Sequence, residues 1–352
     1  MAEQATYDIR EAIQAVVEGK ELTIEQASAA MDAIMTGQAT GSQIGALLTA
    51  LRMRGETVGE IAGFASTMRR HALQVTLPSD DTPVVDTCGT GGDGAGTFNV
   101  STTAAFVIAG AGVRVAKHGN RSITSRCGSA DLLEGLGVRI DLTPEQVATC
   151  IEAAGIGFMF APSFHPGFKH AGPTRREIGI RTIFNVLGPL TNPAGVRRQI
   201  IGVGHPAIAR KLAEAQALLD ADHVLVVHSE GTDEIGIAGT TTITEFDRRV
   251  GEVRTYEVGP ETFGLERAPL ERICGGTVEQ NVAITRAVLG GEPGPYRDVT
   301  VLNAGAGLYV ANAASSIEEG IAMAAESIDS GRALAALQNL VTVSNRLESE
   351  AA

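Results

Sequence analysis

The sequence predicts an α/β fold in which a small N-terminal helical domain precedes a larger α/β domain with a mostly parallel central sheet. Two observations support this prediction. Up to about residue 71, apolar side chains recur at helical spacing, and no segment has the pattern of a strand. From Pro83 onward, short runs of valine, isoleucine and phenylalanine alternate with helical patterns, which is typical of parallel sheets covered by helices. We therefore expect a helical domain over residues 1–75 and an α/β domain over residues 76–352.

The helical domain has recognisable helix boundaries. Capping boxes at Thr23-x-x-Gln26 and Thr57-x-x-Glu60 predict the start of two helices, and Gly55 predicts the end of the helix between them. No catalytic pattern stands out in this part of the chain. We expect the domain to include a further helical segment near residues 165–185 and to form a subunit interface.

The α/β domain is expected to consist of alternating elements in the following order. Strands are predicted near residues 83–85, 113–116, 156–160, 200–203 and 223–227, and helices near 101–109, 129–136, 144–155 and 206–219. A hairpin over residues 240–246 and 253–258 and a helical tail from residue 283 complete the prediction. Because parallel strands end on the same edge of a sheet, we expect ligands to bind at that edge.

The most informative stretch is DTCGTGGDGAGTFNVST, from Asp86 to Thr102. Five glycines lie between Gly89 and Gly96, after a predicted strand and before a predicted helix. Glycine permits positive φ and lets a ligand approach bare N–H groups, and the first amides of a helix attract anions. The loop therefore predicts a phosphate site, and an ordinary capped turn is the alternative.

The kind of phosphate ligand follows from what surrounds the loop. Gly89-x-Gly91-x-x-Gly94 matches a dinucleotide fingerprint, but that fingerprint also needs an acidic residue about 20 positions later. Here the next predicted strand runs into KHGNRS, residues 117–122, which is basic and predicts a second anion site. No Gly-Lys-Ser/Thr ends the loop, so the Walker pattern is absent.

Two further polar clusters accompany these anion sites. Asp233 and Glu234 follow a predicted strand; they form either a solvated turn or a pair that holds Mg2+ against a phosphate. The second cluster, within residues 162–181, contains six cations or histidines: His165, Lys169, His170, Arg175, Arg176 and Arg181. Pro173-Thr174 predicts a helix that starts at Arg175, where basic side chains oppose the helix dipole, so a bound carboxylate or phosphate would compensate. A solvated helix start is the alternative.

The composition excludes several classes of protein. A net charge of −13, only 4% aromatic residues and no tryptophan argue against a nucleic-acid-binding surface. No apolar run is long enough to cross a bilayer, and the polar N-terminus is not a secretory signal. The four cysteines include no CxxC pair, which is typical of a reducing compartment. We expect a cytoplasmic protein without membrane or nucleic-acid partners.

Taken together, GTGGDGAGTFNVST, KHGNRS and RTIFNVLGPLTNPAG resemble the anthranilate phosphoribosyltransferase family, and the resemblance extends over nearly the whole chain. It implies a nucleoside-phosphorylase-like fold and a homodimer joined through the helical domain. It also implies transfer of phosphoribose from 5-phosphoribosyl 1-pyrophosphate (PRPP) to the amine of anthranilate, with Mg2+, in L-tryptophan biosynthesis.

The resemblance also implies roles for residues at matching positions. The PRPP-binding residues would be Gly89, Gly92, Asp93, Thr97, Asn99, Val100, Ser101, Thr102, Lys117, His118, Gly119, Asn120, Arg121, Ser122, Ile123, Thr124, Ser125 and Ser129. Anthranilate would contact Gly89, Asn120 and Arg175, and Mg2+ would bind Ser101, Asp233 and Glu234. No general base is assigned.

The chain departs from the family pattern in a few places, and three other classes of protein remain open. Ser122, Cys127, Phe168 and Lys169 differ from common family residues or lie in a variable segment, which puts the fine substrate preference in doubt. A pyrimidine-nucleoside phosphorylase shares the expected architecture but fits KHGNRS poorly. A nucleic-acid-binding homologue is disfavoured by the net charge of −13, and a dinucleotide-dependent dehydrogenase by the missing acid.

Overall fold

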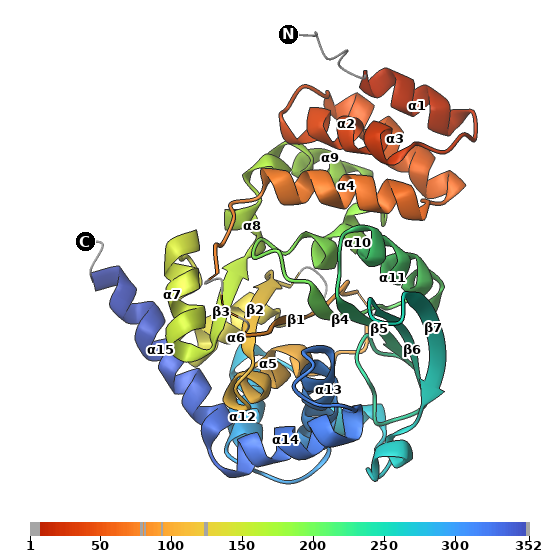
Figure 1. Ribbon diagram of the computed structural model, residues 1–352. Coiled ribbons are helices and arrows are strands. Elements are labelled where there is room, and N and C mark those ends of the chain that lie inside the picture. Colours follow the sequence, from red (N-terminus) through yellow and green to blue (C-terminus); the bar gives the residue numbers. More distant parts are fainter. Residues whose placement is uncertain (1–7, 78–79, 81, 93, 123–125, 350–352) are drawn as a thin grey trace.

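The computed structural model describes residues 8–77, 80, 82–92, 94–122 and 126–349. Its centre is a seven-stranded sheet of order β3-β2-β1-β4-β5-β6-β7 (Figure 1). The strands are β1 (Val84–Gly89), β2 (Arg114–Gly119), β3 (Ile156–Phe160), β4 (Arg198–Gly202), β5 (His223–Ser229), β6 (Thr241–Asp247) and β7 (Glu252–Val258). Strands β1 to β5 pair in parallel, and β6 and β7 add an antiparallel hairpin. The predicted fold class is therefore confirmed.

The N-terminal helices form where the capping residues place them. They are α1 (Ile9–Val17), α2 (Ile24–Met35), α3 (Gly41–Arg54) and α4 (Val58–His71). The capping boxes at Thr23 and Thr57 are both present, and Gly55 ends α3 with a φ of 89°. Thr40 forms a third capping box with Gln43, which we did not predict. Each box satisfies amides that a helix start would otherwise leave unbonded.

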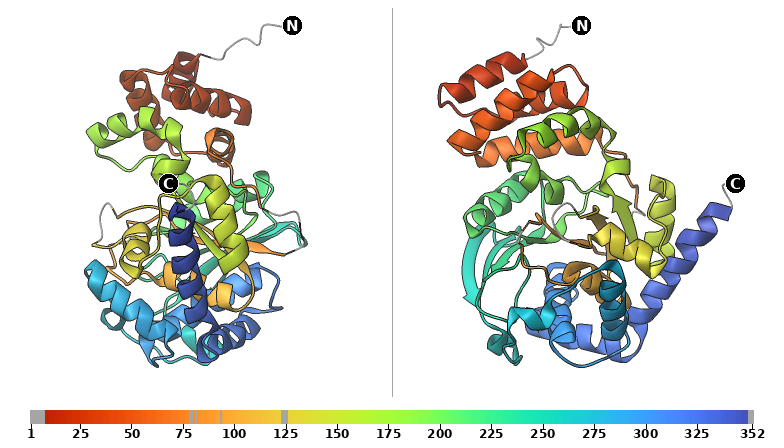
Figure 2. Two further views of the ribbon diagram at one scale, coloured as in Figure 1. Left: turned by 90° about the vertical axis from the view of Figure 1, so that its left-hand side faces the viewer. Right: turned by 180° about the vertical axis from the view of Figure 1, so that it is seen from behind.

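Short helices link this helical part to the sheet. They are α8 (Ala161–Phe164), η1 (Pro166–His170), α9 (Gly172–Ile178), α10 (Phe184–Leu187) and η2 (Gly188–Thr191). Helix α9 packs on α3, and η1 packs on α2. Helices α8 and α10 lie between α4 and the sheet (Figure 1), and Figure 2 shows the same region from two further sides. One continuous apolar cluster runs from Leu47 of α3 through Phe184 of α10 to Val224 of β5. The helical part is therefore joined to the sheet by buried apolar surface.

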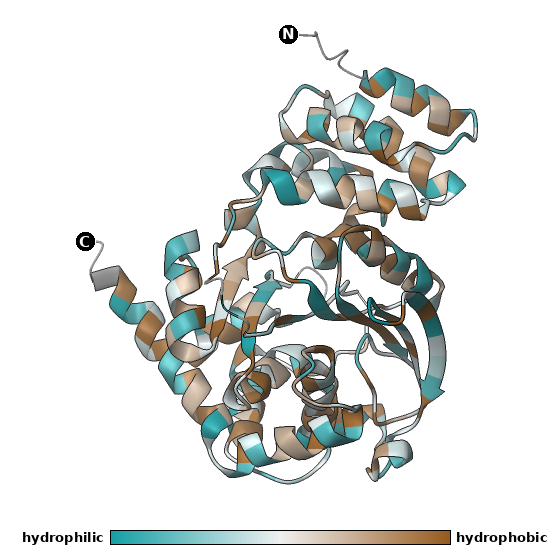
Figure 3. Ribbon diagram, viewed as in Figure 1, coloured by the Kyte–Doolittle hydropathy of each residue, from teal (hydrophilic) through white to brown (hydrophobic). Residues whose placement is uncertain are grey.

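The remaining helices cover the two faces of the sheet. They are α5 (Val100–Gly110), α6 (Ser129–Leu136), α7 (Pro144–Ala154), η3 (Pro206–Ile208), α11 (Ala209–Leu218), η4 (Pro260–Phe263), η5 (Leu270–Ile273), α12 (Val278–Leu289), α13 (Pro295–Val310), α14 (Ile317–Asp329) and α15 (Arg332–Ser349). Helices α5 and α13 lie on one face, and α11 lies between the other face and α4. Apolar and polar bands alternate along α14 and α15, as expected of helices with one buried side (Figure 3).

Two predicted strands are longer than the sequence indicated. Strand β1 continues to Gly89, which pairs with Gly202 of β4, and β2 continues to Gly119, which pairs with Phe160 of β3. The first residues of the glycine-rich stretch and of KHGNRS therefore belong to the sheet itself, because ladder hydrogen bonds hold them. Among the described residues, no helix is both long and apolar enough to span a membrane.

Candidate active site

The carboxyl ends of β1, β2 and β4 meet at one edge of the sheet, and the polar motifs gather there. After Gly89 the chain turns away with positive φ at Gly91, Gly92, Gly94 and Gly96. Such values are strained for other residues, which explains the number of glycines. Thr97 and Cys274 form an isolated β-bridge that fixes the far end of the loop. The backbone of this loop is thus exposed but anchored at both ends.

Asp233 and Glu234 bracket this loop with their carboxylates. Oδ2 of Asp233 accepts the N–H of Gly91 at 3.2 Å, and Oε1 of Glu234 accepts the N–H of Ser101 at 3.2 Å. Both side chains are half-buried. The adjoining Ile235 is held by Asn303, which accepts its N–H at 3.0 Å and donates to its carbonyl at 2.9 Å. The predicted metal residues are therefore together at the start of α5, and their oxygen atoms suit Mg2+.

Some predicted residues at the start of α5 are buried. Val100 and Thr102 are only 0% and 1% exposed, so neither presents accessible surface at the edge of the sheet in this structure. Asn99 donates from Nδ2 to the carbonyl of Cys127 at 3.1 Å. Its Oδ1 is buried and has no hydrogen-bond partner among the described residues. A buried polar atom without a partner is costly, and a ligand donor would compensate it.

The side chain of Lys117 points into the core, although its motif predicted a contact with an anion. Lys117 is 2% exposed, and its Nζ donates to the carbonyl of Thr87. Burial lowers the pKa of Lys117, and the charge of the fully buried Asp86 opposes that shift. Asp86 in turn accepts the N–H of His118 at 3.3 Å and Nδ2 of Asn192 at 2.8 Å. In this structure Lys117 therefore contacts β1 rather than solvent.

His118 and His165 form a buried pair of imidazoles at the same edge. Their ring centres are 5.1 Å apart, and Nε2 of each ring has no hydrogen-bond partner among the described residues. Burial lowers the pKa of His118 to about 3 and that of His165 to about 4, so both rings are neutral at pH 7. The sequence placed His118 in one predicted anion site and His165 in another basic cluster. It did not predict that the two rings meet, because no spacing pattern joins residues that come together only through the fold.

The flank of the KHGNRS loop is held by α6. Arg121, which is 47% exposed, forms ion pairs with Asp131 at 2.9 Å and with Glu134. Oγ of Ser129 donates to the carbonyl of Asn120 at 3.2 Å. Four predicted site residues, Asp93, Ile123, Thr124 and Ser125, lie outside the described residues.

Arg175 lies on α9, but not where the sequence placed it. Helix α9 begins at Gly172 and ends at Ile178, so Arg175 and Arg176 occupy its last turn. Cations are favoured at a helix C-terminus, and the predicted conflict with the dipole was therefore wrong. The guanidinium of Arg175 stands 5.8 Å from the centre of the Phe168 ring, and the described residues offer it no carboxylate partner. Burial lowers the pKa of Arg175, and the positive charge of Arg181 lowers it further.

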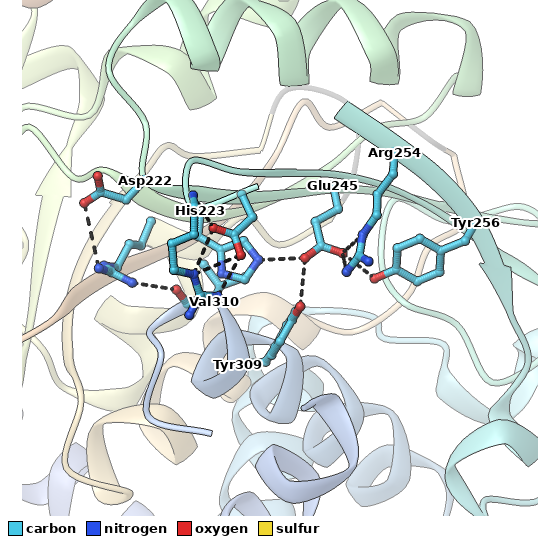
Figure 4. Close-up of polar contacts among 10 residues, drawn as sticks. Asp222, His223, Glu245, Arg254, Tyr256, Tyr309 and Val310 are labelled. Carbon is cyan, nitrogen blue, oxygen red and sulfur yellow. Dashed lines mark hydrogen bonds and ion pairs between the residues drawn. The ribbon is translucent and has the colours of Figure 1, made fainter. Parts of the chain in front are cut away.

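A second acidic cluster lies at the opposite end of the sheet, where β5 begins and β6 ends. Figure 4 shows the polar contacts in this region. His223, Glu245 and Asp247 bring a ring nitrogen and two carboxylates within 4.8 Å of one another. Glu245, however, already accepts hydrogen bonds from four side chains: His223, Tyr309, Tyr256 and Arg254. Asp247 is paired with Arg249 at 2.7 Å. Because arginines neutralise both carboxylates, this cluster fits a structural role better than a metal site.

The chain is similar to known proteins over nearly its whole length. The model of the glycosyl transferase family a/b domain matches residues 81–334, and that of the glycosyl transferase family helical bundle domain matches residues 10–72. Anthranilate phosphoribosyltransferase from Thermomicrobium roseum is 56% identical over 338 residues, which are 95% of this chain and 97% of that protein. The enzyme from Chloroflexus aurantiacus is 57% identical over 340 residues, 96% and 99% of the two chains.

Solved structures show the same similarity in three dimensions. Anthranilate phosphoribosyltransferase from Thermus thermophilus is 44% identical and superposes with a TM-score of 0.89, covering 95% of this chain and 99% of its own. The Saccharomyces cerevisiae enzyme, solved in complex with PRPP and Mg, is 30% identical with a TM-score of 0.88 over 98% and 99%. By sequence over nearly its full length and by fold, this chain belongs to the anthranilate phosphoribosyltransferase family of enzymes.

Proposed function

We propose that this chain transfers the phosphoribosyl group of PRPP to the amine of anthranilate, releasing pyrophosphate, as a step of L-tryptophan biosynthesis. The observation that carries the proposal is the meeting of the glycine loop with Asp233 and Glu234 at one edge of the sheet. Loop N–H groups suit a phosphate, and paired carboxylates suit a divalent metal on that phosphate. The identity of the acceptor, anthranilate, is proposed from the family to which the chain belongs.

The donor would bind along the loop and the start of α5. The backbone of Gly89 and Gly92, the hydroxyls of Thr97 and Ser101, and Asn99 are assigned to PRPP. The remaining residues assigned to PRPP are Asp93, Val100, Thr102, residues 117–125 and Ser129. In this structure Lys117 donates to the carbonyl of Thr87, so its contribution would be to hold β1 in place.

Mg2+ is assigned to Ser101, Asp233 and Glu234, because Glu234 contacts the backbone of Ser101 and Asp233 contacts the adjacent glycine loop. When bound, Mg2+ neutralises the negative charge that develops on departing pyrophosphate. Asp233 and Glu234 orient the loop through their hydrogen bonds, so that its N–H groups are already arranged before the reaction.

The acceptor would lie between Arg175 and the donor. Anthranilate carries a carboxylate next to its amine, and the guanidinium of Arg175 can bind both carboxylate oxygens at once. Gly89 and Asn120 are assigned to the same subsite. The amine is neutral at pH 7, so holding it in line with the ribose removes much of the remaining barrier. His118 and His165 are neutral and have Nε2 atoms without partners, which suits hydrogen bonds to a polar ligand.

We also propose that residues 1–75 and the segment near 165–185 form a helical domain through which two copies associate. Met53 and Val17 are 84% and 70% exposed on this part of the molecule, which favours a covered surface. Light scattering should give twice the chain mass at micromolar concentration. A monomer mass would contradict this proposal and leave the assigned reaction in place.

The experiment that tests the reaction follows anthranilate consumption in the presence of PRPP and Mg2+. Turnover should require both substrates, should stop when the metal is chelated, and should release one pyrophosphate per anthranilate. Orthophosphate with a pyrimidine nucleoside should give no product. Phosphorolysis of the nucleoside without anthranilate turnover would contradict the proposal and would favour the phosphorylase alternative.

A further inference from the structure

Arg181 belongs to the basic segment of residues 162–181, and no role has been assigned to it above. It lies in the segment between α9, which carries Arg175, and α10. The side chain is half-buried, and its Nη1 donates to the carbonyl of Gly92 at 3.2 Å. Among the residues that the structure describes, Arg181 forms no ion pair with a carboxylate. The structure therefore places a charged group against the glycine loop, and no carboxylate within the described part of the chain pairs with it.

The contact between Arg181 and the loop depends on the glycine at position 92. Gly92 has a φ of +73°, and a Cβ built on it would lie 2.7 Å from Nη1 of Arg181. The guanidinium thus occupies the space that any side chain at this position would take. Gly94 has nearly the same φ, +74°, but a Cβ there would have nothing within 4 Å. Close approach of Arg181 is consequently a specific property of Gly92 within the loop.

The electrostatics favour an anion beside this contact. A carbonyl oxygen carries partial negative charge and would repel a phosphate, but the hydrogen bond from Arg181 offsets that charge at Gly92. A guanidinium has five N–H donors in a planar fork, so one bond to a carbonyl leaves others for a second acceptor. Arg181 also lies close enough to Arg175 for the two positive charges to repel, and an anionic ligand would relieve that repulsion.

We propose that Arg181 is a binding residue of the donor subsite: one side of its guanidinium holds the carbonyl of Gly92, and the other binds the diphosphate of PRPP. The inference rests on the proposed function and adds Arg181, from a distant segment, to the loop, the 117–125 segment and the metal that are already assigned to the donor. In this proposal Arg175 binds the carboxylate of the acceptor, and Arg181 binds the diphosphate of the donor.

The test is calorimetric titration of PRPP, and separately of inorganic pyrophosphate, into the full-length protein with Mg2+. Arg181→Gln removes the charge, and Arg181→Met keeps the length of the side chain for packing. Either variant should bind both ligands about ten- to a hundred-fold more weakly, as expected when a charge-assisted hydrogen bond is lost. The Michaelis constant for anthranilate should stay within about threefold, because Arg175 is unchanged.

Arg210→Gln is the charge-matched control. Arg210 is paired with Glu214 at 2.8 Å on α11 and is 62% exposed, so its loss should alter binding by less than about twofold. Folding of each variant is followed by its thermal unfolding midpoint, and one folded variant of Arg181 is enough to decide. Wild-type affinity for PRPP and pyrophosphate in such a variant would overturn this inference while the wild-type reaction stands. Absence of PRPP binding by the wild-type protein would instead overturn the proposed function.

Discussion

The two acidic clusters at opposite ends of the sheet differ in what their carboxylates contact. Asp233 and Glu234 are half-buried and accept backbone N–H groups of Gly91 and Ser101. Glu245 is 1% exposed and accepts from side chains on β5, β7 and α13. Asp233 and Glu234 therefore contact the loop backbone that we expect to bind a ligand. Glu245 instead connects two strands to a helix. Carboxylate clustering alone therefore does not identify a metal site; burial and the partners of the carboxylates do.

The largest effect should come from the pair at the glycine loop. Asp233→Asn with Glu234→Gln removes both charges that we assign to Mg2+, and metal stabilisation of a leaving group supplies several kcal/mol. We expect kcat/KM at limiting Mg2+ to fall about a hundred-fold or more, with an unchanged unfolding midpoint. Metal titrations of initial rate provide the measurement. An unaltered dependence on Mg2+ would remove both residues from the site.

Glu245→Gln should lower stability and leave turnover unchanged, the opposite of the effect expected for the Asp233 and Glu234 variant. Glu245 is buried and accepts hydrogen bonds from the buried His223 and from Tyr309 and Tyr256, so losing its charge weakens several charge-assisted hydrogen bonds at once, at a total cost of about 3–5 kcal/mol. We expect thermal unfolding to begin roughly 5–15 °C lower, while turnover per folded molecule at 25 °C is retained. Lost metal dependence in this variant would show that the two clusters had been assigned to the wrong roles.

The pH dependence of the unfolding midpoint gives a second test of the structural role of Glu245. Burial raises the pKa of Glu245, but hydrogen bonds from His223, Tyr309, Tyr256 and Arg254 outweigh it and lower the pKa to about 2, from the ordinary 4.5. A lowered carboxyl pKa stabilises the fold above the unfolded value, and this contribution is lost as the pH falls from about 4.5 toward 2. The difference in unfolding midpoint between wild type and Glu245→Gln should therefore be constant from pH 7 to pH 5 and should shrink below pH 4.5. A difference that disappears already near pH 6 would contradict the proposed contacts.

Arg175→Ala tests the proposed anthranilate subsite. Losing a charge-assisted hydrogen bond costs roughly 1.5–3 kcal/mol, which corresponds to about a ten- to hundred-fold higher Michaelis constant for anthranilate. The constant for PRPP should change little, because the loop and the metal hold that substrate. Kinetics with each substrate varied in turn would check this. Loss of PRPP affinity with retained anthranilate affinity would mean that the two subsites are reversed.

A smaller effect is expected from the backbone of the loop. Gly92→Ala adds about 1–2 kcal/mol of strain at positive φ and also meets Arg181, so PRPP affinity should fall about five- to thirty-fold. Gly94→Ala is the matched control, since its φ is also positive but the space around its Cβ is open. Calorimetry should show the larger loss for Gly92→Ala. Equal losses would assign the whole effect to strain and none to the contact with Arg181.

Much of the fold could be predicted because its signals are local. Capping boxes at Thr23 and Thr57 and the alternation of strands and helices depend on neighbours in the sequence, and the structure contains them. Strand ends were placed too early at Val85 and Ala116, because ladder pairing across the sheet extends both strands. The dipole conflict at Arg175 was a wrong prediction, since α9 starts three residues before it.

The candidate site was less accessible from sequence for a physical reason. Its motifs identified which segments carry polar groups, but not which way each side chain points. Lys117 lies inside a basic motif and yet donates to the buried carbonyl of Thr87. His165 meets His118, and Arg181 meets Gly92, only because distant segments are folded together. Contacts of this kind have no spacing pattern that a single sequence could reveal.

The most direct test of the central claim is anomalous diffraction from crystals grown with PRPP and with Mn2+ in place of Mg2+. One measurement examines both acidic clusters in the same molecule. The account predicts an anomalous peak beside Asp233 and Glu234, adjoining density for the diphosphate at the glycine loop, and no peak among His223, Glu245 and Asp247. A peak at His223, Glu245 and Asp247 with none at the glycine loop would contradict it.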